Sequence, residues 1–193
     1  MSTQQSVEPE QDEGWIETYS RTQFWPLTAE GYVYLNDIAH HLALRNRFSG
    51  ATNEPYSVAQ HSVTVARVLE PYGRKVQLQG LLHDAAEAYL PDIPRPIKQD
   101  VYLWCKGTMK EFCEVEDAIM QRVCEYAGCD WPLHPAVKEA DNRVCATERR
   151  DLMCSRHDWG VMDEIEPYSF TIKPWKWQKA ERKFLQMFEE LCQ

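Results

Sequence analysis

The sequence lacks a long apolar run, a Cys-x-x-Cys pair and an excess of basic residues. Acidic residues number 30 against 21 Lys and Arg, so the formal net charge is −9. A surface that binds a nucleic acid polymer needs clustered positive charge, and this balance therefore argues against such a partner. No stretch has the length and apolarity of a membrane span or of a secretory signal, and we expect no membrane partner.

Cysteine usage points in the same direction. The seven cysteines are odd in number and scattered over the chain. Without a signal peptide, such a set predicts reduced thiols and a cytoplasmic location, since disulfide frameworks belong to oxidising compartments. The 193 residues, 44% of them hydrophobic, suit one globular domain, which we place at residues 14–193. Residues 1–13 are polar and acidic, and we predict a disordered tail.

Hydrophobic periodicity predicts a mainly α-helical fold without internal repeats. Aromatic residues alternate with polar breaks between residues 15 and 35, which favours a small N-terminal β-hairpin. Capping boxes are expected at Ser57–Gln60 and at Thr108–Glu111, and Asn36-Asp37 resembles a third N-cap. Residues 168–172 read as a short extended piece. The expected helices cover approximately residues 36–45, 57–69, 76–89, 108–128, 135–152 and a last segment from 177.

One stretch, residues 81–92, carries ionisable groups inside an apolar run. His83, Asp84 and Glu87 have the spacing that would place all three on one side of a continuous helix. Burying that side unpaired would cost roughly several kcal/mol per charge unless a metal or a counter-charge neutralised it. A solvated helix face is the simple alternative, but the surrounding Leu and Ala residues leave little polar surface for one.

Two further residues, His61 and Asp141, lie on the expected inner faces of other helices. Each alone would equally suit a core or capping role, and His157-Asp158 repeats the His-Asp pair where no helical stripe supports it. Jointly, two imidazoles and two carboxylates form a mixed N/O ligand set. Such a set suits divalent Mn, Fe, Co, Ni or Zn, whereas Mg is less suited to imidazole ligands.

The motifs around these residues resemble those of HD-domain phosphohydrolases, from about Trp15 to the last helix. The similarity is greatest to bacterial 5′-deoxynucleotidases and to small phage and prophage HD proteins, which include dATP triphosphohydrolases. The resemblance implies an HD-domain helical bundle. The runs that carry it are residues 54–62 (EPYSVAQHS), 81–98 (LLHDAAEAYLPDIPRPIK), 138–141 (KEAD) and 146–152 (ATERRDL).

The resemblance also implies roles for individual residues. His61, His83, Asp84 and Asp141 would be the metal ligands, and Glu87 and Asp92 the catalytic carboxylates beside the attacking water. The remaining positions, Arg47, Phe48 and Lys98, would contact the substrate. Deoxynucleotidases carry Arg-Trp where this chain has Arg47-Phe48, so any contact made by the indole N–H is lost and the choice of nucleotide stays open.

The expected reaction is metal-dependent hydrolysis of a 2′-deoxynucleotide 5′-phosphate at the α-phosphorus, with dATP giving deoxyadenosine and triphosphate. Glu87 would accept a proton from water or bind a second ion, and Asp92 would orient the water or protonate the leaving 5′-oxygen. Arg47 and Lys98 would stabilise the phosphate charge. Alternatives are a nucleotidase acting on deoxynucleoside monophosphates, a hydrolase of cyclic or signalling nucleotides, and a nucleotide-binding regulatory protein with a degenerate site.

Several residues outside this set carry expectations of their own. Surplus tryptophans such as Trp104 and Trp131 would fill the core or line an interface, and the family resemblance favours a homo-oligomer. We expect Glu148, Arg149 and Arg150 to form ion pairs within or between subunits. We expect His40, His41 and His134 to be structural or exposed.

Overall fold

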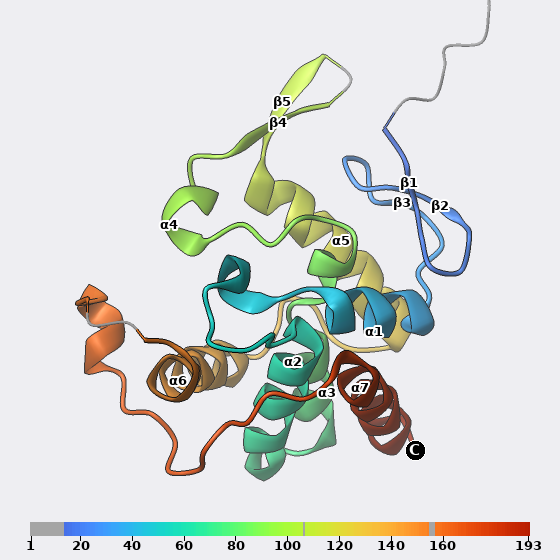
Figure 1. Ribbon diagram of the computed structural model, residues 1–193. Coiled ribbons are helices and arrows are strands. Elements are labelled where there is room, and N and C mark those ends of the chain that lie inside the picture. The colour runs from blue at the N-terminus through green and yellow to red at the C-terminus, as the bar shows by residue number, and fades with distance from the viewer. Residues whose placement is uncertain (1–13, 106, 155–156) are drawn as a thin grey trace, which may run out of the picture.

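The computed structural model describes residues 14–105, 107–154 and 157–193 (Figure 1). The expected acidic tail, residues 1–13, lies outside these ranges. The fold is mainly α-helical with a small N-terminal antiparallel sheet, as predicted. The helices are α1 Leu35–Leu44, α2 Val58–Val68, α3 Arg74–Leu82, α4 Arg95–Lys98, α5 Phe112–Ala127, α6 Pro135–Leu152 and α7 Trp177–Leu191. The 3₁₀ turns are η1 Arg47–Gly50, η2 Glu70–Tyr72, η3 Ala85–Ala88 and η4 Gly160–Glu164.

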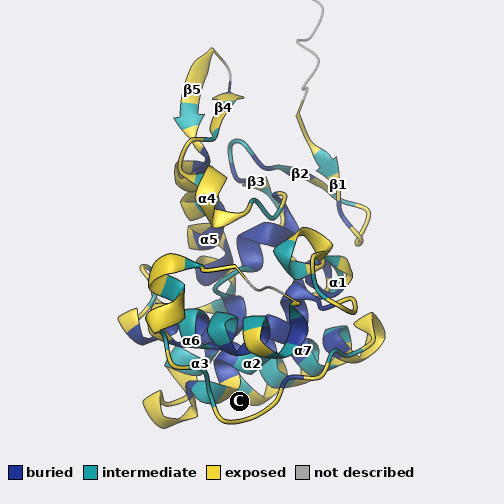
Figure 2. Ribbon diagram, turned by 60° about the vertical axis from the view of Figure 1, so that its left-hand side comes forward, coloured by how far each residue is buried: buried dark blue, intermediate teal, exposed yellow. Residues whose placement is uncertain are grey.

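Helix α2 lies at the centre of the bundle and packs against α1, α3, α6 and α7. Its sequence VAQHSVTVARV is buried almost all round, because helices cover it on several sides. Figure 2 shows buried residues gathered where α1, α2 and α7 meet. Polar residues of α2, including Gln60, His61 and Ser62, are buried along with the apolar ones. The centre of the fold is therefore also where buried polar chemistry is concentrated.

The N-terminal sheet contains three strands rather than a single hairpin: β1 Ile16–Glu17, β2 Gln23–Trp25 and β3 Glu30–Gly31. They pair antiparallel in sequence order. Only Gly fits at position 31, since its φ is +113° and an added Cβ would lie 2.8 Å from the carbonyl oxygen of Gln23. Phe24, on the middle strand, is fully buried and anchors the sheet to the core.

A second hairpin, β4 Tyr102–Cys105 with β5 Thr108–Glu111, was not expected from the sequence. It projects away from the helices in Figure 1. The predicted capping box at Thr108–Glu111 is wrong because these residues pair with β4. Helix α5 starts instead at Phe112, where Glu111 and Glu114 form the reciprocal box, and it ends at left-handed Gly128.

Two smaller expectations also need correction. Helix α1 begins at Leu35 after Tyr34, and Asp37 does not cap it; its carboxylate accepts a hydrogen bond from the Ser20 N–H at 2.6 Å. Ser57 caps α2 by accepting from the Gln60 N–H, but the Gln60 side chain bonds to the chain at residues 173 and 175 instead of closing a box. Residues 168–172, expected to be a short extended piece, lie outside the helices and strands.

The expected helix through residues 76–89 is right only as far as Leu82, and the correction beyond that residue matters for the site. Helix α3 ends at Leu82, and Asp84 leaves helical geometry at φ −104° and ψ 17° before η3 begins. His83 Nδ1 lies 2.8 Å from the Gly80 carbonyl oxygen. The imidazole therefore satisfies a backbone carbonyl group of the last turn of the helix. His83, Asp84 and Glu87 therefore do not share one helix face.

Candidate metal centre

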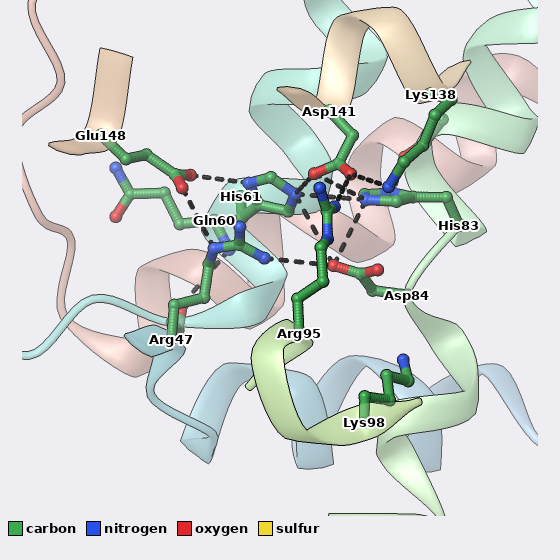
Figure 3. A network of polar contacts seen from close by, with 12 residues as sticks. Arg47, Gln60, His61, His83, Asp84, Arg95, Lys98, Lys138, Asp141 and Glu148 are labelled. Carbon is green, nitrogen blue, oxygen red and sulfur yellow. Dashed lines mark hydrogen bonds and ion pairs between the residues drawn. The ribbon is translucent and has the colours of Figure 1, made fainter. Parts of the chain in front are cut away.

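Three side chains from different helices converge on one point, as Figure 3 shows: His61 from α2, His83 at the end of α3 and Asp141 from α6. One ligand atom of each lies within 4.8 Å of those of the other two. Nε2 of His61 is 3.2 Å from Nε2 of His83 and 3.3 Å from Oδ1 of Asp141. This group of two histidines and one aspartate could hold a metal ion, and it contains three of the four ligands expected from the sequence.

Asp84 lies beside this group without belonging to its compact core. Its Oδ2 is 3.3 Å from Nε2 of His83 and 3.6 Å from Nε2 of His61. Donor atoms bound about 2.0–2.1 Å from one tetrahedral ion are separated by about 3.3 Å, so these spacings suit a shared divalent ion. The same Oδ2 also accepts from Nη1 of Arg47 at 3.2 Å. The role of Asp84 as a fourth ligand stays a prediction.

His61 is fully buried and uses both ring nitrogens. Nδ1 lies 2.6 Å from Oε1 of Glu148, a carboxylate on α6 with no exposed surface. Sequence reasoning assigned Glu148 only to an ion pair and missed its contact with His61. The available signal was its spacing from Asp141, since residues seven apart lie on the same face after two helical turns.

Arg47 connects the two carboxylates. Its Nε lies 3.1 Å from Oε2 of Glu148, and its Nη1 reaches Asp84. The turn that carries Arg47 is strained, because Phe48 and Ser49 have φ values of +54° and +50°. Such a conformation costs roughly 1 kcal/mol or more per residue and is concentrated at functional sites. It turns the Phe48 ring toward Trp159, with centroids 6.1 Å apart.

The pKa values follow from these contacts. Burial and the Arg47 guanidinium both oppose protonation of His61, but the Glu148 and Asp141 carboxylates outweigh them and raise its pKa to about 9. Burial also opposes ionisation of Asp141, yet its hydrogen bond to His61 and the charge of His83 hold its pKa well below the ordinary value. The cluster therefore favours ionised carboxylates, which are the form that binds metals.

The pKa values of Glu87 and Asp92 shift upward, opposite to that of Asp141. Burial first, and then the negative charges of Asp84 and Asp92, raise the pKa of Glu87 well above its ordinary value. Burial is also the largest cause raising the pKa of Asp92, with Asp84 adding to it. The segment that carries Glu87 is held to α1, where His41 Nδ1 lies 2.7 Å from the Ala88 carbonyl oxygen.

Three further cationic side chains, Lys138, Arg95 and Lys98, lie near the cluster and differ in exposure. Lys138 and Arg95 reach Oδ2 of Asp141 at 3.0 and 3.5 Å, and their side chains are 62% and 58% exposed, so they stand at the outer rim. Lys98 is less exposed and lies 2.5 Å from Oε1 of Glu116 (Figure 3 shows it below Asp84). Neither Lys138 nor Arg95 was singled out from the sequence.

The other histidines do not belong to the metal-capable group. His40 contacts Glu181 and stacks on Tyr19, and His134 caps α6 through its ring nitrogen, so both are structural as expected. His157 does not belong to the metal-capable group. Arg149 and Arg150 form ion pairs within the chain, with Asp163 and Asp151.

Fold and site together define a mainly helical protein with a buried His/Asp group that could hold a metal ion. No family model matches the chain. It is 30% identical to the uncharacterised protein YfdR of Escherichia coli K12 over 181 residues, which are 92% of this chain and 96% of YfdR. It is 34% identical over 126 residues to the uncharacterised protein RCAP_rcc00048 of Rhodobacter capsulatus, covering 62% and 63% of the two chains. The chain belongs to the family of YfdR. Among the described residues, no helix combines the length and apolarity needed to cross a membrane.

Proposed function

We propose that this protein is a metal-dependent phosphohydrolase of the HD type, which cleaves 2′-deoxynucleotide 5′-phosphates at the α-phosphorus. Its proposed substrate is a deoxynucleoside triphosphate, with dATP first, and its products are the nucleoside and triphosphate. The observation that carries the proposal is the convergence of Nε2 of His61, Nε2 of His83 and Oδ1 of Asp141 within 4.8 Å of one another.

The donor set supports a divalent ion of the borderline transition series. Two imidazole nitrogens favour Mn, Fe, Co, Ni or Zn over Mg, which prefers oxygen ligands. Asp141 adds a charged oxygen donor that any of these divalent ions can use, since its pKa is held well below the ordinary value. A divalent ion bound there would supply Lewis acidity toward a phosphate oxygen and toward a water molecule.

Glu87 suits the role of general base. Its carboxyl is buried, and burial with the charges of Asp84 and Asp92 raises its pKa, which makes the carboxylate a stronger base than an exposed glutamate. In the proposed reaction it takes a proton from the attacking water. Asp92, whose pKa is raised by burial, would hold a proton for the leaving 5′-oxygen.

The surrounding cations support a phosphate-bearing substrate in an otherwise acidic protein. Arg95 and Lys138 stand at the rim on different helices, and both face Asp141. A polyphosphate chain held near Asp141 could exchange these ion pairs for contacts with its own oxygens. Arg47 and Lys98 are already paired with carboxylates. They would stabilise the phosphate charge through the field of their fixed positive charges.

The test is a substrate panel. Mono- and triphosphates of the four deoxynucleosides are incubated with Mn, Co or Zn, with and without a chelator, and products are separated by chromatography. The expected result is chelator-sensitive release of nucleoside, together with triphosphate from a dNTP or phosphate from a dNMP. His83→Ala and Asp141→Ala should abolish turnover, whereas His157→Ala, which alters the other His-Asp pair, should retain it. No nucleoside with any metal overturns the proposal.

A further inference from the structure

Glu148 is a buried carboxylate for which the proposed reaction has no direct use. Its side chain is fully buried in α6, two turns after Asp141, and its two oxygens contact different partners. Oε1 lies 2.6 Å from Nδ1 of His61, and Oε2 lies 3.1 Å from Nε of Arg47 (Figure 3). A buried carboxylate is costly to desolvate, so a carboxylate held in this way needs both contacts.

The two ring nitrogens of His61 face different partners. The nitrogen facing Glu148 is Nδ1, and the nitrogen facing His83 and Asp141 is Nε2, at 3.2 and 3.3 Å. A neutral imidazole carries its proton on one nitrogen only, and an acceptor at Nδ1 selects the form in which Nε2 has a free lone pair. A metal ligand needs that lone pair.

We propose that Glu148 is a positioning residue, which accepts the Nδ1–H of His61 and so directs Nε2 at the point shared with His83 and Asp141. The inference rests on the metal site of the proposed function and deepens it. Arg47 neutralises the other oxygen of Glu148 and keeps the carboxylate oriented. Carboxylates that orient ligating histidines commonly contribute about 10–100-fold to metal affinity.

The first test measures Zn(II) affinity by calorimetry in the full chain. Glu148→Gln should weaken binding by about 10-fold or more, because an amide is a weaker acceptor than a carboxylate and carries no charge. Glu148→Asp should recover part of the loss. The matched control is Asp151→Asn, which neutralises another α6 carboxylate with partners outside the cluster, Arg150 and the Ile172 N–H. Unchanged affinity in Glu148→Gln overturns the inference.

A second measurement needs no variant and guards against misfolding. In the Zn(II)-loaded wild type, long-range ¹H–¹⁵N correlation should show His61 with a protonated Nδ1 and a Zn-bound Nε2. Coordination through Nδ1, or no Zn(II) binding at all, overturns the inference. Neither readout uses turnover. The two proposals can therefore fail separately. If wild type hydrolyses no nucleotide but Glu148→Gln still weakens Zn(II) binding, the inference holds and the proposed function is rejected.

Discussion

Nη1 of Arg47 lies 3.2 Å from Oδ2 of Asp84, although 37 residues separate them along the chain. Through Nε the same guanidinium holds Glu148, so one arginine neutralises two carboxylates beside the metal-capable group. Burial opposes its protonation, but Glu148 and Asp84 raise the pKa of Arg47 well above the ordinary value. The strained turn at Phe48 and Ser49 therefore directly follows Arg47, whose positive charge neutralises these two carboxylates.

Replacement of Arg47 should be costly. Arg47→Met leaves Glu148 buried without its cation, and breaking a buried pair in this way typically costs about 3–5 kcal/mol. The free energy of unfolding, measured by urea denaturation, should fall by that order. Arg150→Met serves as the control, because the Arg150–Asp151 pair is more exposed and should change stability by no more than about 1 kcal/mol. Equal losses in the two variants would assign Arg47 an ordinary surface role.

Metal should stabilise the folded protein. An ion that binds only the native state at 100 times its dissociation constant adds about 2.7 kcal/mol to the free energy of unfolding. We expect Mn, Co or Zn to raise the Tm of wild type in a scanning calorimeter, and a chelator to reverse the rise. His83→Ala should show no rise, while its helical circular dichroism stays close to that of wild type. A wild-type Tm that no divalent ion moves would contradict the site.

Asp84 distinguishes a three-ligand site from a four-ligand site. Its Oδ2 lies within 3.6 Å of both histidine Nε2 atoms but also bonds Arg47. If Asp84 is a ligand, Asp84→Asn should weaken metal binding at least about 10-fold, because the ion loses a charged donor. The measurement is the dissociation constant from titration with Zn(II). An unchanged constant would leave His61, His83 and Asp141 as the protein ligands and assign Asp84 to holding Arg47.

The raised pKa of Glu87 predicts a pH dependence of stability. Between the ordinary pKa of a glutamate and the raised value, the folded state keeps a proton that the unfolded state has lost. Stability should therefore fall as pH rises through this window, by at most about 1.4 kcal/mol per pH unit. Glu87→Gln removes the effect, so its Tm relative to wild type should increase with pH. The comparison is made on chelator-treated protein, and a difference that is flat with pH would contradict the raised pKa.

Local patterns were enough to predict most of the helical framework. The apolar stripes of α5, α6 and α7 and the Ser57 cap of α2 depend on contacts within a few residues, and these elements lie close to the expected ranges. The Thr108–Glu111 segment failed because its partner strand, Tyr102–Cys105, satisfies its backbone in a way that no local cap signal reveals.

The mainly helical fold and the residue types of the metal-capable group were readable from the chain alone, since periodicity and ligand chemistry are properties of the residues. Which of these groups come into contact depends on how the helices pack. Helix α3 stops at Leu82, so His83 and Asp84 reach the site through a change of backbone direction rather than a shared helix face. Arg47 was expected near the substrate, but its contact with Glu148, and the contact of Glu148 with His61, depend on the packing of α2, α6 and the turn before α2. Such buried charges are stable only when they are paired, here across long stretches of chain.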